Sequence, residues 1–280
     1  MGALELSLLF PAFIAGLLVI STHVPMGRQV LARGIVFIDL AIAQVAGLGV
    51  TAAAAFGFDG AGWTVQVSAV AAALLAALLL RWTERRWPSV QEALIGVLFV
   101  FAASVELLLL ANNPHGGEHL KDLLVGQILW VSIDSLWPVA AMYAVVLAVW
   151  FLARDRIGRF GFYALFALVV TQSVQLVGIY LVFATLIAPA LAARFWPDRF
   201  GLAIAYGVAV AGYVIGLLAS AAFDLPTGAV IVVAIVGLMS VSILLRGPEK
   251  SVAAAPAAEA PAARRHPGAG GPVPGGKRAR

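Results

Sequence analysis

Long apolar runs alternate with short polar segments along most of the sequence. Gly, Pro and charged residues separate apolar runs that we place at residues 4–22, 35–56, 63–80, 93–111, 136–153, 161–176, 177–195, 201–222 and 227–245. A helix needs about 20 apolar residues to cross a bilayer, so this pattern predicts roughly eight or nine membrane spans. We therefore expect an all-α fold, a polytopic bundle of transmembrane helices over residues 1–246.

One apolar run contains a proline well inside it. Pro189 has no backbone N–H and its ring clashes with the preceding turn, so the run 177–195 predicts a broken helix. Two arrangements stay open. The run forms a membrane-crossing hairpin with 161–176, or it is a re-entrant arm that enters and leaves on one side.

Composition supports this interpretation and excludes several classes of protein. The 280 residues are 62% hydrophobic and only 11% charged, whereas a soluble domain carries about 25% charged residues. No polar block is long enough for a soluble enzyme, an ATPase or a nucleic-acid-binding module. The absence of cysteine excludes disulfides and thiolate metal sites. We expect no covalently bound cofactor and no catalytic activity.

The final segment, residues 247–280, has a different composition. It is rich in Ala, Pro and Gly and has no apolar period, so it predicts a disordered tail. Its basic residues suit either contact with anionic lipid or simple solubility.

The basic residues that give the net charge of +4 are concentrated in alternate loops. Arginines follow the first, third, fifth and ninth runs and precede the eighth, whereas Lys121 is the one basic residue in the other loops. Cytoplasmic loops retain Lys and Arg, so the pattern predicts an inner-membrane protein whose tail is cytoplasmic. The basic excess therefore indicates membrane topology and not nucleic-acid binding.

Two carboxylates lie inside apolar runs, where each costs several kcal/mol unless it is paired or hydrated. Asp39 lies near the predicted cytoplasmic end of the second run, and a functional role is favoured there. Glu106 lies near the outer end of the fourth run. For Glu106, a functional role and a structural role reaching the headgroups are equally open.

Three sets of motifs resemble one family of transport proteins. They are VGIYLVFATLIAPALAARF at 177–195, DLPTGA at 224–229, and EALIGVLF at 92–99 with DLLVGQILWVS at 122–132. In order and spacing they resemble the integral-membrane permeases of the type 3 ATP-binding-cassette family, over roughly residues 10–245. The resemblance implies import of zinc, manganese or iron as substrate. It also implies a homodimer, a separate ATPase subunit that uses ATP, and an extracytoplasmic metal-binding protein.

The resemblance also implies metal ligands in the second run, but this sequence departs from the motif. The family carries D-x-x-x-H there, whereas Asp39 is followed four residues later by Ala43, and Gln44 aligns with the histidine. Asp39 and Gln44 lie about 140° apart on a regular helix, so both face one ion only across a bulge. Loss of the imidazole favours manganese or iron over zinc.

An outer loop, ANNPHGGEHLKD, holds further ligand types. His115, Glu118 and His119 fall close together, which suits either an ion-collecting loop or an ordinary solvated loop. The string H-x-x-E-H matches a zinc-protease pattern, but the adjacent glycines oppose the helix that such a site needs.

The predicted cytoplasmic turn RDRIGRFG, residues 154–161, is shorter than the family pattern. It lacks the F-D-P-E-x-A-x-x-L-G run that marks the coupling helix contacting the ATPase. The segments 26–34 and 81–89 are alternative docking sites or plain positive anchors. Three functions therefore stay open: an importer permease, a transporter or channel of this fold without ATPase coupling, and a membrane scaffold that transports nothing.

Overall fold

The computed structural model describes residues 3–57, 63–110, 124, 126–152 and 154–246, and all regular elements in these ranges are helices. The elements are α1 (Ala3–Arg33), α2 (Ile38–Ala55), α3 (Trp63–Arg86), η1 (Pro88–Val90), α4 (Gln91–Leu110), η2 (Ile128–Trp130), α6 (Ile133–Leu152), α7 (Arg154–Val177), α8 (Ile179–Arg194), α9 (Asp198–Phe223) and α10 (Thr227–Arg246). The all-α prediction is confirmed. The predicted tail, residues 247–280, lies outside the described residues.

Eight of the described helices are long and apolar enough to cross a membrane. The ninth, α8, has 16 residues, which corresponds to about 24 Å. The number of long apolar helices identifies a multi-pass membrane protein, as the apolar runs predict.

The break in the seventh run lies at Gly178 and not at Pro189. Gly178 alone joins α7 to α8, with a φ of 82° that favours glycine. The helix α8 continues through Pro189. A Cβ on Gly126 would overlap the backbone of Val177 and Gly178, so the segment before η2 packs directly against this break.

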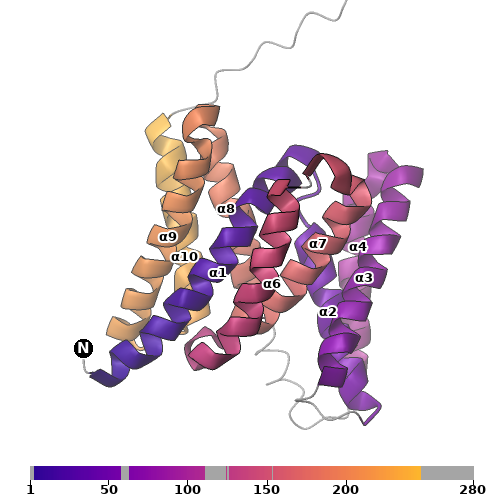
Figure 1. Ribbon diagram of the computed structural model, residues 1–280, viewed down its shortest axis with the longest axis horizontal. Coiled ribbons are helices and arrows are strands. Elements are labelled where there is room, and N and C mark those ends of the chain that lie inside the picture. The colour runs from indigo at the N-terminus through magenta and orange to yellow at the C-terminus, as the bar shows by residue number, and fades with distance from the viewer. Residues whose placement is uncertain (1–2, 58–62, 111–123, 125, 153, 247–280) are drawn as a thin grey trace, which may run out of the picture. The chain divides into compact units, whose positions relative to one another are not determined.

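The described helices pack in two groups (Figure 1). In one group α2 packs against α3, α4 and α7, and in the other α8 packs against α1, α9 and α10. The helix α6 contacts α1 and α7. The two groups lie next to one another along α2 and α8, and their apolar faces form the core of the bundle.

A close crossing of α1 and α8 ties the second group together. A Cβ on Gly27 would overlap the carbonyl of Leu186, so only glycine permits this approach. Just before it, Pro25 leaves the carbonyl of Ser21 without its helical partner. The hydroxyl of Tyr206, on α9, donates to this carbonyl at 3.3 Å, so α1 continues through the proline.

Candidate functional site

The most buried carboxylate of the described chain lies between α2 and α4. Glu106 on α4 is 0% exposed, and its carboxylate accepts hydrogen bonds from the Gln44 amide and, at 2.8 Å, from the Thr51 hydroxyl. Gln44 and Thr51 are seven residues apart on α2, so they share one helix face. Both donors thus converge on one acceptor, which we call the Glu106 cluster. Glu106 points into the protein, so the hypothesis that it reaches the headgroups is wrong.

Asp39 lies separately, in the first turn of α2. Its side chain is 1% exposed, and neither carboxylate oxygen has a hydrogen-bond partner among the described residues. The helix α2 is regular from Ile38 to Ala55, without the bulge that would bring Asp39 and Gln44 onto one face. The structure therefore pairs Gln44 with Glu106 and leaves Asp39 about 7.5 Å further along the axis.

A second carboxylate lies near Asp39. Glu92, in the first turn of α4, accepts a hydrogen bond from the backbone N–H of Phe37 at 3.1 Å, and its other oxygen is buried without a described partner. Phe37 lies two residues before Asp39, so both carboxyl groups lie near the start of α2. Two acidic groups therefore share the start of α2, where the positive end of the helix dipole offsets part of their repulsion. An added cation would offset the rest.

A cavity of about 650 Å³ lies between the two helix groups. Leu40, Gln44 and Phe99 line it from α2 and α4, and Tyr180 and Phe183 line it from α8. Gln44 and Tyr180 carry the polar side chains of an otherwise apolar wall. Such a wall cannot solvate a divalent ion, so polar chemistry in this cavity is confined to the edge where the Glu106 cluster begins.

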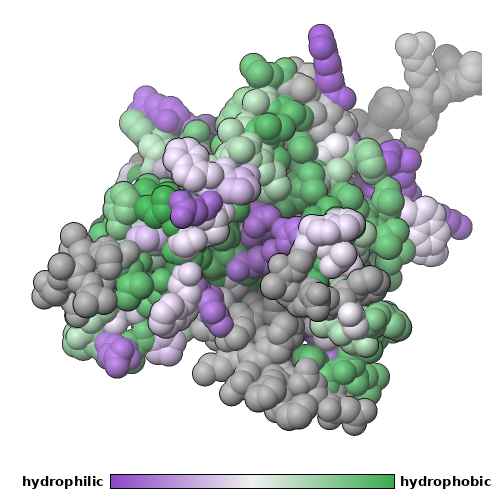
Figure 2. All heavy atoms as spheres, turned by 60° about the horizontal axis from the view of Figure 1, so that its bottom comes forward, coloured by the Kyte–Doolittle hydropathy of each residue, from purple (hydrophilic) through white to green (hydrophobic). Residues whose placement is uncertain are grey.

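Two of the motif segments meet at the end of the bundle opposite the arginines. Residues 126–130 and 224–228 line a pocket of about 410 Å³, although almost 100 residues separate them in the chain. Asp224 in this pocket takes the left-handed conformation, with a φ of 50°. Figure 2 brings this end forward and shows hydrophilic residues among apolar ones near its centre. The two motif segments therefore build one pocket at this end of the bundle.

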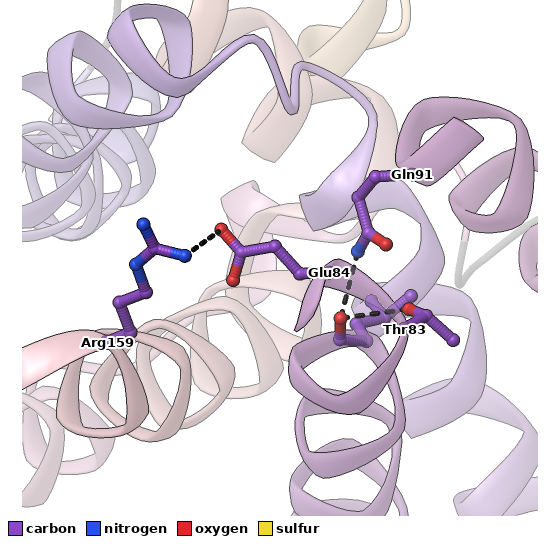
Figure 3. A network of polar contacts seen from close by, with 5 residues as sticks. Thr83, Glu84, Gln91 and Arg159 are labelled. Atoms are coloured by element: carbon purple, nitrogen blue, oxygen red, sulfur yellow. Dashed lines mark hydrogen bonds and ion pairs between the residues drawn. The ribbon is translucent and has the colours of Figure 1, made fainter. Parts of the chain in front are cut away.

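The opposite end gathers arginines from several helices. Arg159 at the start of α7 pairs with Glu84 at the end of α3, at 3.7 Å, and Arg33 of α1 lies 4.0 Å from the Phe162 ring centre. Gln91 and Thr83 both donate to the Leu80 carbonyl at 2.9 Å, which fixes the turn between α3 and α4 (Figure 3). The loops predicted to be cytoplasmic therefore meet at one end.

Other polar candidates have local structural roles or lie outside the described ranges. Gln172 on α7 accepts a hydrogen bond from Gln66 on α3 at 2.8 Å, which joins the two helices. His23 bonds through Nδ1 to the Val19 carbonyl of its own helix at 3.0 Å. The loop residues His115, Glu118 and His119 lie outside the described residues. Their ion-collecting role stays a prediction.

Sequence reasoning missed two members of this region, Thr51 and Glu92. The spacing of Gln44 and Thr51 was the available signal for Thr51, since residues seven apart lie on one helix face. Glu92 begins the EALIGVLF motif, but its place beside the start of α2 depends on how α4 packs, which the sequence does not show.

Comparison with known proteins places the chain among membrane transport components. A model of the ABC 3 transport family matches residues 5–158 and 155–246. An uncharacterized membrane protein of Synechocystis sp. is 26% identical over 253 residues, 82% of this chain and 88% of the relative. A probable metal transport system membrane protein of Thermotoga maritima is 27% identical over 252 residues, 82% of this chain and 86% of the relative.

Two further matches agree. A probable iron transport system membrane protein of Haemophilus influenzae is 28% identical over 163 residues, 51% of this chain and 60% of the relative. The solved structure of PsaBC from Streptococcus pneumoniae in complex with Fab is similar with a TM-score of 0.65 and 20% identity, over 84% of this chain and 89% of that one. At this identity the structural match shows the fold alone.

The two pieces of the family match join at residues 155–158. These residues lie in the first turn of α7, where Gly158 interrupts the helix with a φ of 59°. The interruption of the match coincides with the segment in which the sequence departs from the family pattern.

Proposed function

Because the chain belongs to the ABC 3 transport family, we propose that it is the membrane permease subunit of an ATP-driven importer for a divalent metal cation. The Glu106 cluster carries the proposal. Its carboxylate is fully buried at membrane depth, where it costs several kcal/mol. The hydrogen bonds from Gln44 and Thr51 offset part of that cost. Passage of a divalent cation gives a reason to keep the group.

The proposed path follows the contact between α2 and α4. An ion from the outer pocket would first meet the Glu106 cluster and then Asp39 with Glu92, at the arginine end. Asp39 and Gln44 belong to the same helix, so a movement of α2 would change access to both positions. Alternating access of this kind is common in transporters whose sites lie between helix groups.

Oxygen donors dominate this path. The polar residues of the path offer oxygen ligands: Asp39, Glu92, Glu106, Thr51 and the amide of Gln44. None of the described residues of the path is a histidine. Oxygen ligands suit manganese and iron, whereas zinc favours imidazole and thiolate. The relative from H. influenzae, named for iron transport, supports the same direction. Manganese or iron is therefore the proposed substrate.

Family membership supports three proposed partners: an ATPase subunit, an extracytoplasmic metal-binding protein and a second copy of this chain. The arginine end, with Arg33, Arg81 and Arg159, would face the cytoplasm and the ATPase. The tail, residues 247–280, would then also be cytoplasmic.

Coupling to an ATPase is tested by purifying the full chain from its own membranes through an affinity tag. We expect an ATPase subunit to copurify, and manganese uptake by cells that overproduce this chain to stop when ATP is depleted.

A second candidate function is a transporter of the same fold that needs no ATPase. The join in the family match at residues 155–158 favours it, because this turn would otherwise contact the ATPase. Uptake that survives ATP depletion, together with failure to recover an ATPase, would establish this alternative.

A further inference from the structure

A separate cavity of about 370 Å³ lies at the arginine end, between α1, α6 and α9. Pro25, Arg28 and Gln29 of α1 line it, together with Trp150 of α6 and Tyr206 of α9. Figure 1 shows α1 passing between α9 and α6. The cavity is distinct from the proposed ion path, which follows α2 and α4.

Arg28 differs from the other arginines near it. Arg33 and Arg81 lie over the rings of Phe162 and Phe160, and Arg159 pairs with Glu84. Arg28 is partly buried, yet within the described ranges it makes no hydrogen bond, ion pair or ring contact. No carboxylate lines its cavity. Among the described side chains Arg28 has no counter-charge, and a partly buried cation in that state is costly, so the position favours an anionic ligand.

The position of Arg28 along α1 indicates the kind of anion. Arg28 lies five residues before the end of α1, about 7.5 Å inward along the axis. Its guanidinium lies 3.5 Å from the place where a Cβ on Gly201 would be, so the small residue leaves room beside it. Tyr206, a partly exposed aromatic residue of this cavity, is of an amphipathic type that favours the headgroup level of a bilayer. A lipid phosphate occupies that level.

The surface of α1 below the cavity suits an acyl chain. Four partly exposed residues of α1 are spaced four, three and four apart, which puts them on one helix face: Ile14, Leu18, Ser21 and Pro25. This stripe leads from the cavity toward the middle of the membrane. A chain attached to a headgroup at Arg28 would have a mostly apolar surface to lie against.

We propose that the cavity between α1, α6 and α9 binds an anionic phospholipid, whose phosphate accepts hydrogen bonds from Arg28 and whose acyl chain lies along α1. Guanidinium binds phosphate through two parallel N–H donors. A lipid is favoured over an acidic loop of a protein partner, because a loop would have to enter the headgroup layer to reach Arg28. Basic pockets between transmembrane helices on the cytoplasmic side are known lipid sites.

The test uses the full chain purified in neutral detergent. Phosphatidylglycerol and phosphatidylcholine with identical acyl chains are titrated separately, and the bound lipid is counted by native mass spectrometry. We expect the wild type to bind phosphatidylglycerol about tenfold more tightly, and Arg28→Gln to lose this preference. The control is Arg85→Gln, which removes the same charge from an exposed position at the same end and is expected to keep the preference.

Four results would overturn the proposal. Equal binding of the two lipids by the wild type excludes a site that is specific for an anionic headgroup. If Arg85→Gln loses the preference for phosphatidylglycerol as much as Arg28→Gln does, the preference comes from the net charge of this end and not from the cavity. Displacement of the lipid by millimolar inorganic phosphate indicates a simple anion site. If Arg28→Gln keeps the lipid but no longer copurifies an ATPase, the cavity is a protein-docking surface. If Arg28→Gln fails to fold, the proposal is tested by the lipid preference of the wild type and by Arg28→Lys, which keeps the charge but lacks the two parallel N–H donors and is expected to bind phosphatidylglycerol less tightly.

Discussion

The polar groups buried where α1 crosses α8 are hydroxyls and an imidazole, whereas those buried between α2 and α4 include carboxylates. At the crossing, Thr22 and His23 bond to the Val19 carbonyl of their own helix, and Thr185 bonds to the Leu181 carbonyl of its own helix. Between α2 and α4, Glu106 depends on donors from another helix, and Asp39 has no side-chain partner among the described residues.

In a membrane bundle this difference distinguishes buried polar groups that serve packing from those that indicate a function. A hydroxyl bonded to its own backbone costs little in lipid, so its presence needs no functional explanation. A buried carboxylate remains expensive even when it is bonded. The α1–α8 crossing is therefore interpreted as structural, and the region between α2 and α4 as the place of transport.

The largest expected effect is at the crossing itself. In Gly27→Val the new side chain would overlap the Leu186 carbonyl, which belongs to rigid backbone. Overpacking against backbone is expected to cost about 3 kcal/mol or more, enough to prevent folding. Size-exclusion chromatography in detergent should show no monodisperse protein.

The matched control for this variant is Gly207→Val on α9. A Cβ at Gly207 meets nothing within 4 Å, so this variant should elute as the wild type does. Normal elution of Gly27→Val would show that the two helices are not in close contact.

Asp39→Asn should have the opposite profile: normal folding with loss of transport. The substitution keeps size and polarity but removes the charge that would attract a cation. We expect uptake of radioactive manganese in cells to fall about tenfold or more at equal expression, equivalent to ~1.4 kcal/mol. Unchanged uptake would mean that Asp39 is structural.

Gln44→Ala should have a smaller effect on the same path. It removes one of the two described donors to Glu106, but Thr51 still donates. Manganese uptake is expected to fall by about threefold, less than in Asp39→Asn, since a hydrogen bond to a charged group contributes ~1.5–3 kcal/mol and part of this is regained by solvation. A larger loss than in Asp39→Asn would reverse the ranking of the two positions.

The smallest effect is expected at Tyr206. Tyr206→Phe removes the donor to the Ser21 carbonyl that Pro25 leaves free, at a cost of about 0.5–1.5 kcal/mol. Thermal unfolding in detergent should shift by a few degrees, with uptake unchanged. In a Pro25→Ala background the same change should cost less, because the helix can then satisfy that carbonyl itself.

The spans were predictable because a bilayer requires about 20 apolar residues whatever their order. The end of the first span was not. The run 4–22 stops where His23, Pro25 and Arg28 interrupt it, but α1 continues to Arg33. The Tyr206 hydroxyl satisfies the carbonyl that the proline frees, and this contact from α9 leaves no local signal in the sequence.

The candidate site was predictable only residue by residue. Asp39, Gln44 and Glu106 stand out because polar residues are rare in apolar runs. The pairing of Gln44 with Glu106 depends on the packing of α2 against α4. The resemblance aligned Gln44 with a ligand position beside Asp39, whereas helix periodicity puts the two about 140° apart. The break at Gly178 was likewise assigned to Pro189, because proline is the stronger helix breaker in isolation.

The central claim, that carboxylates between α2 and α4 carry the cation, is tested most directly at Glu106. Glu106→Gln and Thr22→Val would be purified with the native complex, reconstituted into vesicles with ATP, and assayed for manganese uptake per folded protein. The claim predicts that Glu106→Gln lowers uptake about tenfold or more, while Thr22→Val, an equally buried change at the α1–α8 crossing, stays within about twofold. Normal uptake by Glu106→Gln, or an equal loss in both variants, would contradict it.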